Sequence, residues 1–159
     1  MTRLPSPHRP RVLAPIKRVK GIEYDVLDEL IGYSLRRAQV AMFFAFHTAT
    51  RGLEITPPRF TALVLVGANP GISQSTLGTV LGIARSGAMM LANWMVGRGV
   101  AERRRHPEDG RVWGLYLTAA GERFVLKMKR NVRAEDRKAS GLNAAERRQL
   151  LRLLEKLAV

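Results

Sequence analysis

The sequence predicts a mainly α-helical fold that carries one small β-hairpin. Three observations lead to this prediction: two short helical segments are separated by a glycine, two strand-like runs are joined by a basic turn, and long helical segments lie on both sides of that stretch. A chain of 159 residues is long enough to bury a real hydrophobic core within one domain.

The first short helix is expected to begin at Ser73, because a serine hydroxyl can accept a hydrogen bond from a free amide of the first turn. Gly82 ends this segment, and a second helix is expected over residues 84–96. The predicted inner face of the second helix consists of Ala88, Leu91, Ala92 and Met95. Two helices joined by a tight glycine turn form a helix-turn-helix, whose second helix fits the major groove of DNA.

A β-hairpin is expected directly after these helices. Residues 100–104 and 112–117 are short runs with β-branched or aromatic side chains, and the sequence HPEDG between them is typical of a turn. Basic side chains crowd the rim of this hairpin: Arg103, Arg104, Arg105, His106 and Arg111. A basic hairpin beside a helix-turn-helix predicts a winged helix, whose wing can reach a DNA backbone or a minor groove.

This stretch resembles the MarR family (multiple antibiotic resistance regulators) of winged-helix transcription factors. The family's wing pattern is Asp-x-Arg, then three residues, then Leu-x-Leu-Thr-x-x-Gly. The chain matches it without a gap at Asp109, Arg111, Leu115, Leu117, Thr118 and Gly121, and Arg98 and Gly99 match the family's Arg-Gly before the first strand. The resemblance runs from about Tyr24 to the C-terminus. It implies a homodimeric, sequence-specific transcriptional regulator, and we expect a repressor that a small ligand releases.

The charge balance indicates a polyanionic partner. The chain has 27 Lys and Arg against 13 Asp and Glu, a formal net charge of +14 and a pI of about 11.4. Residues 55–101 contain no acid, which would favour an approach to phosphate, although an apolar core would explain part of that absence. Double-stranded DNA with a pseudo-palindromic operator is the predicted partner. The alternative is a non-specific nucleic-acid packaging or RNA-binding protein without an effector.

The composition also bears on the compartment. The chain has no cysteine, which excludes disulfides and thiol chemistry and fits a cytoplasmic protein. No apolar run approaches the roughly 20 residues that a membrane span needs, and the N-terminus has no hydrophobic core of a signal peptide. A cytoplasmic location without membrane contact is therefore expected.

Residues 1–20 are expected to form a basic extended arm, because the segment combines basic residues and prolines with no acid. The arm could lie along DNA phosphates or wrap the partner subunit, or it could be a solvated tail. Residues 21–159 are expected to form a single MarR-like domain. Within it, dimerisation helices over 23–52 and 118–159 flank a winged helix-turn-helix over 56–117.

The dimerisation helices are predicted from their apolar faces. One helix of about 28 residues is expected from Glu23 or Tyr24 to Arg51, apolar around much of its girth. The last helix carries a large apolar face formed by Leu150, Leu151, Leu153, Leu154 and Leu157. The predicted caps of the helices are Gly52, Thr56 followed by Pro57, Thr118, and Asn143 in a capping box with Glu146.

No catalytic, metal or cofactor site is expected. The three histidines, at positions 8, 47 and 106, are far apart and lack the spacing of metal ligands. No glycine-rich stretch matches a nucleotide-binding loop. Glu108 and Asp109 could be read as a carboxylate pair, but the resemblance instead implies that Asp109 orients Arg111.

The predicted DNA-binding residues lie on the two short helices and the wing. They are Ser73, Gln74, Ser75, Arg85, Ser86, Gly87, Met89, Met90, Asn93, Arg103, Arg104, Arg105 and Arg111. Arg85 is expected to read guanine and Asn93 adenine, while Met89 and Met90 would favour methyl contacts and DNA shape unless Met90 is packed in the core. Arg111 is expected to enter a minor groove, the alternative being a surface ion pair with Asp109 or Glu108.

A ligand site is expected on the first long helix, because the family commonly binds small aromatic anions between its dimerisation helices and its DNA-reading part. The candidates are Tyr33, Arg36, Arg37, Phe43, Phe44 and His47, which combine aromatic rings with arginine. The expected effector is an aromatic acid or its CoA thioester. The alternative is that Phe43 and Phe44 belong to the core and that Arg36 and Arg37 pair with acids of a partner helix.

Overall fold

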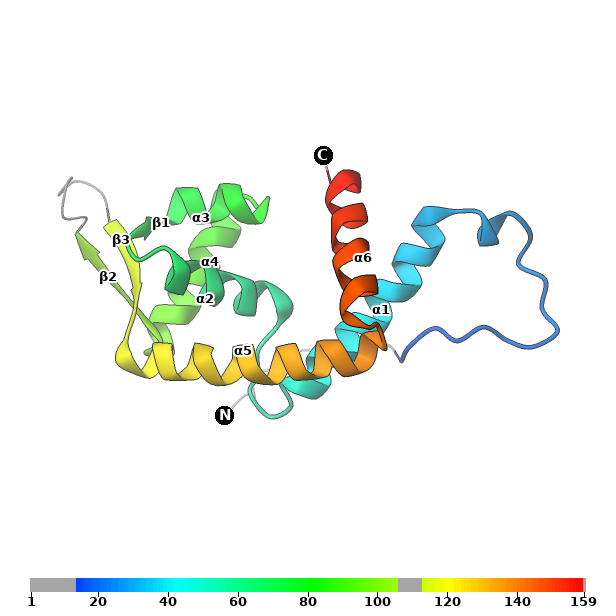
Figure 1. Ribbon diagram of the computed structural model, residues 1–159. Helices are drawn as coiled ribbons and strands as arrows, with labels where there is room; N and C mark the ends of the chain where they lie inside the picture. Colours follow the sequence, from blue (N-terminus) through cyan, green and yellow to red (C-terminus); the bar gives the residue numbers. More distant parts are fainter. Residues whose placement is uncertain (1–13, 106–112, 159) are drawn as a thin grey trace, which may run out of the picture. The chain divides into compact units, whose positions relative to one another are not determined.

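The computed structural model describes residues 14–105 and 113–158 of the chain. Its elements follow one another in the order η1 (Asp25–Asp28, a 3-10 helix), α1 (Ile31–Ala49), α2 (Pro57–Ala68), β1 (Ile72–Ser73), α3 (Gln74–Leu81), α4 (Arg85–Gly97), β2 (Ala101–Arg105), β3 (Trp113–Leu117), α5 (Ala119–Ser140) and α6 (Ala144–Leu157) (Figure 1). The prediction of a mainly α-helical winged helix-turn-helix is confirmed.

The chain divides into two compact units. One unit comprises Ala49–Ala134, and we call it the head. The other comprises Met1–Thr48 and Glu135–Val159, and we call it the flanking unit. The division falls within α5.

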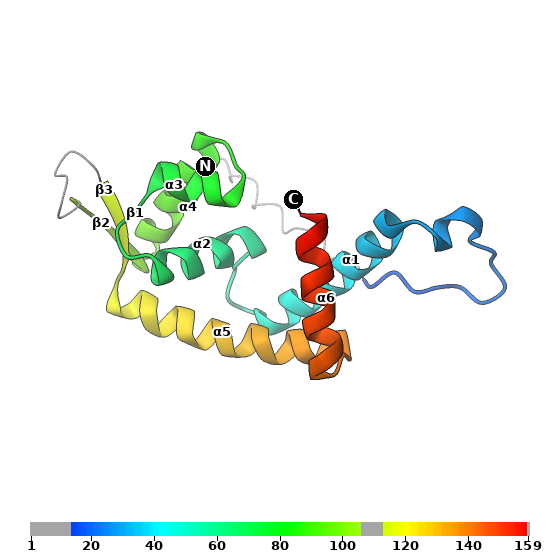
Figure 2. The same ribbon diagram turned by 45° about the horizontal axis from the view of Figure 1, so that its top comes forward.

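The head contains α2, α3, α4 and a three-stranded antiparallel sheet in the order β1-β3-β2. Both α2 and α4 pack against the sheet, and α3 packs on α4 (Figure 2). Its core is formed by large side chains that are less than 2% exposed, namely Leu63, Val66, Leu77, Met95, Leu115 and Met128. The predicted hairpin is present. The third strand, β1, was not predicted, because two residues are too few to show the alternation of a strand.

The turn between α3 and α4 has the geometry that the sequence predicts. Ser73 caps α3, and its hydroxyl oxygen accepts a hydrogen bond of 3.0 Å from the Thr76 amide. Gly82 ends the helix in the left-handed region at φ 62°, where a residue with a Cβ atom is strained. This turn sets the direction in which α4 leaves α3.

The Thr-x-x-Gly part of the wing pattern forms the corner between the sheet and α5. Thr118 Oγ1 accepts a hydrogen bond of 3.0 Å from the Gly121 amide and donates one of 2.8 Å to the Gly99 carbonyl, so the predicted cap is confirmed. A Cβ atom on Gly121 would lie 1.8 Å from the carbonyl oxygen of Val100. Only glycine therefore allows the start of α5 to pass this close to the backbone before β2.

In the flanking unit, the prediction of one helix from Tyr24 to Arg51 is wrong at both ends. An α-helix does not begin at Tyr24, because Asp25 has φ 46° and interrupts a right-handed helix. The chain instead forms η1, and α1 starts at Ile31. The Tyr24 hydroxyl accepts a hydrogen bond of 3.0 Å from the Val19 amide, which ties the preceding segment to this turn. The helix ends at Ala49, so Gly52 is not its C-cap and lies in the loop that follows.

The cap of α6 agrees with the prediction. Asn143 Oδ1 accepts hydrogen bonds from the amides of Ala145 and Glu146, and Glu146 Oε2 accepts one of 2.8 Å from the Asn143 amide. Thr56 holds the N-cap position of α2, with proline following, but its side chain makes no capping hydrogen bond. Within the described parts of the chain, no helix is both long and apolar enough to cross a membrane.

Candidate nucleic-acid interface

The outward face of α4 is the first component of the candidate site. Its inward side chains, Ala88, Ala92 and Met95, are fully buried in the head. The opposite face consists of the exposed side chains Arg85, Ser86, Met89, Met90 and Asn93. The alternative that Met90 is a core residue is wrong, because Met90 is 67% exposed.

Gly87 differs from the other predicted residues of α4. It is half-buried, and a Cβ atom there would lie 3.5 Å from Ile83 Cδ1, so this position contacts the preceding turn. At the start of α3, Ser73 and Gln74 are half-buried and Ser75 is exposed. The Ser73 hydroxyl is already used for capping and lies 2.9 Å from Ser75 Oγ.

The three arginines of β2 have three different environments. Arg103 Nη2 donates a hydrogen bond of 2.7 Å to Asn93 Oδ1 on α4. Arg104 contacts the carboxylate of Glu102 and lies 5.3 Å from the ring centroid of Tyr116. Arg105 lies 5.8 Å from the centroid of Trp113, its neighbour on the paired strand. Of the three, Arg103 is the one with a hydrogen bond to α4.

A cluster of two arginines around Trp94 contacts α4, and the sequence did not predict it. Trp94 has the guanidinium of Arg59 at 4.6 Å and that of Arg98 at 5.8 Å from its ring centroid. Arg98 also lies 5.9 Å from the centroid of Phe124 and donates a hydrogen bond of 3.2 Å to the Leu53 carbonyl. Trp94 therefore makes two cation–π contacts that connect α4 with α2 and with Arg98 at its own C-terminal end. The Arg-Gly match pointed to Arg98, but no sequence signal pointed to Arg59.

Two predicted site residues of the wing, Asp109 and Arg111, lie outside the described residues. The described part of the wing is β2 and β3, which pair from Ala101 with Leu117 to Arg105 with Trp113. The roles of Asp109 and Arg111 therefore remain predictions.

The predicted ligand residues all lie on α1 in the flanking unit. The Arg37 guanidinium is 5.8 Å from the ring centroid of Tyr33, and its buried Nε atom has no hydrogen-bond partner among the described residues. Phe43 and Phe44 are 47% and 42% exposed, so the alternative that they are core residues is wrong within one chain. Arg36 is exposed and His47 is half-buried.

Tyr33 also belongs to a stack that reaches back before α1. Its ring centroid is 6.2 Å from that of Tyr24, and the Arg18 guanidinium lies 4.4 Å from the Tyr24 centroid. Arg18 Nη2 donates a hydrogen bond of 2.7 Å to Asp28 Oδ2, and this bond raises the pKa of Arg18. The two phenol rings thus lie next to each other, with one guanidinium beside each ring.

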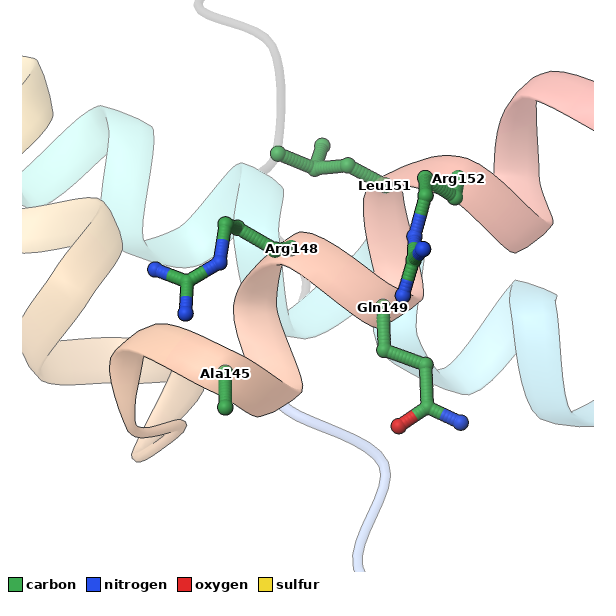
Figure 3. Close-up of a pocket in the computed structure, with 5 residues that line it drawn as sticks. All are labelled: Ala145, Arg148, Gln149, Leu151 and Arg152. Atoms are coloured by element: carbon green, nitrogen blue, oxygen red, sulfur yellow. The ribbon is translucent and has the colours of Figure 1, made fainter.

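A hollow in the flanking unit lies on a different helix. It has a volume of about 480 Å³ and lies along α6 (Figure 3). Its lining residues are Ala145, Arg148, Gln149, Leu151 and Arg152. All of them belong to one helix, so this hollow is part of the outer face of α6. Among the described residues, no group of three or more His, Asp or Glu side chains is placed to hold a metal ion.

An exposed helix face beside a basic strand, on a three-stranded winged head, defines a winged-helix nucleic-acid-binding protein. The sequence pattern of the MarR family matches residues 53–112. The chain is 33% identical over 129 residues to a protein of Thauera aromatica named as the transcriptional regulatory protein for the hcr operon, covering 80% of this chain and 78% of that protein. The chain belongs to the MarR family, and it is a transcriptional regulator, not an enzyme.

Solved structures agree with this assignment. The transcriptional repressor CouR, bound to a 23-mer DNA duplex, aligns with a TM-score of 0.79 at 35% identity over 87% of this chain and 99% of CouR. CouR bound to p-coumaroyl-CoA aligns with a TM-score of 0.72 at 34% identity, over 86% and 97%. The PcaV regulator of Streptomyces coelicolor, in complex with its natural ligand, aligns with a TM-score of 0.72 at 28% identity, over 83% and 94%.

Proposed function

We propose that this regulator is a cytoplasmic repressor that binds a pseudo-palindromic operator as a homodimer and releases it when a small aromatic acid or its CoA thioester binds. Helix α4 of each head enters a major groove, and the wing contacts the adjacent backbone or minor groove. The arm over residues 1–20 lies on DNA or on the partner subunit. Helices α1, α5 and α6 supply the dimer interface.

The observation that carries this proposal is the outward face of α4. Five of its side chains are exposed, and this face lies in a 47-residue stretch, 55–101, that contains no acid. Arg85 stands in the first turn, where a recognition helix meets base edges, and a guanidinium matches guanine O6 and N7. CouR, which aligns over almost its whole length, is a DNA-bound relative with this fold.

The other contacts are assigned by chemistry. Met89 and Met90 offer apolar contact to thymine methyl groups, Arg104 and Arg105 neutralise phosphates, and Ser73, Gln74 and Ser75 lie at the start of α3 near the backbone. Arg111 enters the minor groove, with Asp109 holding its guanidinium.

Selection of bound sequences from a random DNA pool tests the operator. We expect an enriched pseudo-palindrome, and Arg85→Ala should relax the preference at one position per half-site and cost about 1–3 kcal/mol there. Arg130→Ala, which removes an exposed arginine from α5, is the matched control and should leave every base preference unchanged. A wild-type pool without any enriched sequence would instead favour the packaging alternative.

The effector proposal is supported by the side chains of α1. Exposed phenylalanine rings and the half-buried Tyr33 offer apolar contact to an aromatic ring, and the unpartnered Nε of Arg37 can donate to a carboxylate or thioester oxygen. The relatives CouR and PcaV were solved with p-coumaroyl-CoA and with a natural ligand. Such a ligand can release DNA only through its differential affinity for the two states, and about 1.4 kcal/mol of coupling lowers operator affinity tenfold.

Calorimetric titration with aromatic acids and their CoA thioesters tests the effector. We expect at least one compound to bind the wild type and to bind Arg37→Ala at least about tenfold more weakly, as expected for the loss of a charge-assisted hydrogen bond. Gln39→Ala, an exposed position two residues further along α1, is the control and should bind like the wild type. If no compound binds, or if Arg37→Ala binds equally well, the effector site is wrong while the DNA-binding proposal stands.

A further inference from the structure

We infer that Asn93 and Arg103 act as one recognition unit that selects guanine, in place of the adenine that an isolated asparagine favours. The inference rests on the proposed function, because it assumes that α4 lies in a major groove. It concerns which base is chosen at one position of each half-site. The observation that carries it is the contact between α4 and β2.

Arg103 reaches Asn93 because of the alternation of side chains along β2. Arg103 pairs across the sheet with Leu115, which is 1% exposed, so both side chains leave the sheet on the face that covers the core. Helix α4 packs against β2 on the same sheet. The Arg103 side chain is accordingly half-buried, and its Nη2 donates a hydrogen bond of 2.7 Å to Asn93 Oδ1.

This bond fixes the orientation of the Asn93 amide. The oxygen must face the guanidinium, because the reversed amide would place its N–H groups against those of Arg103. The Nδ2 group of Asn93 therefore points away from Arg103 with its two donors. The Arg103 guanidinium has further N–H donors beside this amide. The pair therefore presents several N–H donors to a base edge, and its one side-chain acceptor, Asn93 Oδ1, is already bonded to a cation.

The four bases respond differently to such a surface. Guanine offers two acceptors, O6 and N7, in the major groove, and both can be satisfied by donors from Asn93 and Arg103. Adenine offers N7 but also a donating amino group at N6, which needs the Asn93 oxygen and would be brought against the guanidinium. Cytosine presents a donor and thymine a single acceptor. The pair therefore ranks guanine first and disfavours adenine and cytosine.

The neighbouring arginines supply the internal control. Arg104 is turned to the other face of β2, where it contacts Glu102 and lies over Tyr116. Arg105 shares the face of Arg103 but lies over Trp113. Replacing Arg105 therefore removes the same charge from the same face of β2 as replacing Arg103, but it leaves the hydrogen bond between Arg103 and Asn93 in place.

The test is selection from a random DNA pool with the full-length protein and four variants, after thermal unfolding has confirmed that each is folded. Asn93→Ala first identifies the position that Asn93 reads, because its preference is lost there. At that position the wild type should prefer guanine over adenine by about tenfold, the size expected of a bidentate contact. Arg103→Met should free the amide and change the preferred base to adenine.

The controls separate base selection from charge. Arg103→Lys keeps a donating cation and should keep guanine, and Arg105→Met should lower the affinity for all sequences while guanine stays preferred. The inference is overturned if Arg103→Met lowers affinity uniformly and leaves guanine preferred, or if the wild type already prefers adenine at this position. If the wild type enriches no sequence at all, the proposed function fails, and this inference fails with it.

Discussion

The head and the flanking unit differ in how much apolar surface one chain covers. The head buries large side chains from α2, α3, α4, β3 and α5, including Leu63, Leu77, Met95, Leu115 and Met128. The described part of the flanking unit has two buried apolar residues, Val40 and the small Ala45. The head therefore has a complete core of its own.

The exposed apolar residues are distributed in the opposite way. In the flanking unit, large side chains that are 38–62% exposed include Val19, Ile22, Leu27, Leu30, Ile31, Phe43, Phe44, Leu150, Leu151, Leu153 and Leu157. Burying such a side chain from full exposure contributes roughly 1.5–3 kcal/mol, so covering the exposed half contributes about half of that. The head therefore has the core it needs to stay folded within one chain, and we propose that a partner subunit covers the exposed apolar faces of α1 and α6.

The largest expected effect comes from the backbone contact inside the head. Gly121→Ala places a Cβ atom 1.8 Å from the Val100 oxygen, which belongs to the backbone and cannot move away. We expect a loss of more than about 4 kcal/mol in the free energy of unfolding, measured by urea denaturation. Gly97→Ala is the control, since nothing lies within 4 Å of its added Cβ. Equal stability of the two variants would contradict a tightly packed corner at α5.

The next effect tests whether the apolar face of α6 is an interface. Leu153, which is 50% exposed, should be covered in the dimer, so Leu153→Asp should weaken dimerisation by about 2–4 kcal/mol. Sedimentation velocity at micromolar concentration would then detect monomers. Val80→Asp changes an apolar residue of α3 that is 57% exposed in the head, and it should remain dimeric. If Leu153→Asp sediments as a dimer like the wild type, the face of α6 that carries Leu153 is not a dimer interface.

A smaller effect is expected from the cap of α5. Thr118→Val removes both the acceptor for the Gly121 amide and the donor to the Gly99 carbonyl, and it should destabilise the head by about 1–2 kcal/mol. Thr56→Val is the matched control, because Thr56 occupies a cap position without a side-chain capping bond and should change stability by only a few tenths of a kcal/mol. The urea concentrations at the unfolding midpoints of the two variants measure this difference, and equal midpoints would contradict a stabilising cap at Thr118.

The smallest effect on stability is expected in the flanking unit, at the capping box of α6. Asn143→Ala removes the capping box of α6 and should cost about 1 kcal/mol. If α6 is stabilised by dimerisation, the fall in melting temperature should diminish as protein concentration rises. Asn131→Ala, in the middle of α5 and exposed, should be neutral or slightly stabilising. A concentration-independent effect of Asn143→Ala would argue that α6 folds without a partner.

The features of the fold that depend on local chemistry were predictable from the sequence. The Ser73 cap, the Gly82 turn and the Asn143–Glu146 capping box each require particular residues at short spacing, and all three are present. The replacement of the first helical turns by η1 was not predictable, because no local pattern indicates the positive φ at Asp25 or the Tyr24 contact with the preceding segment. The two-residue strand β1 is defined only by its pairing with β3.

The candidate site shows the same limit. The inward and outward faces of α4 followed from helical periodicity, and the exposure of Arg85 and Asn93 agrees with it. Two contacts between elements did not follow: the bond from Arg103 to Asn93, ten residues apart, and the approach of Arg59 on α2 to Trp94 on α4. Both depend on how α4 packs against β2 and α2, which no local pattern specifies.

Hydroxyl-radical footprinting of the wild-type protein on its selected duplex tests whether two heads read the operator together, because it records how many heads bind and where. Two heads related by a two-fold axis should give two matching blocks of protection, with centres about 10 base pairs apart or a multiple of that. Leu153→Asp should weaken both blocks together, since each head relies on its partner to stay on the operator. A single block, or even protection along the whole duplex, would contradict a dimeric, sequence-reading repressor.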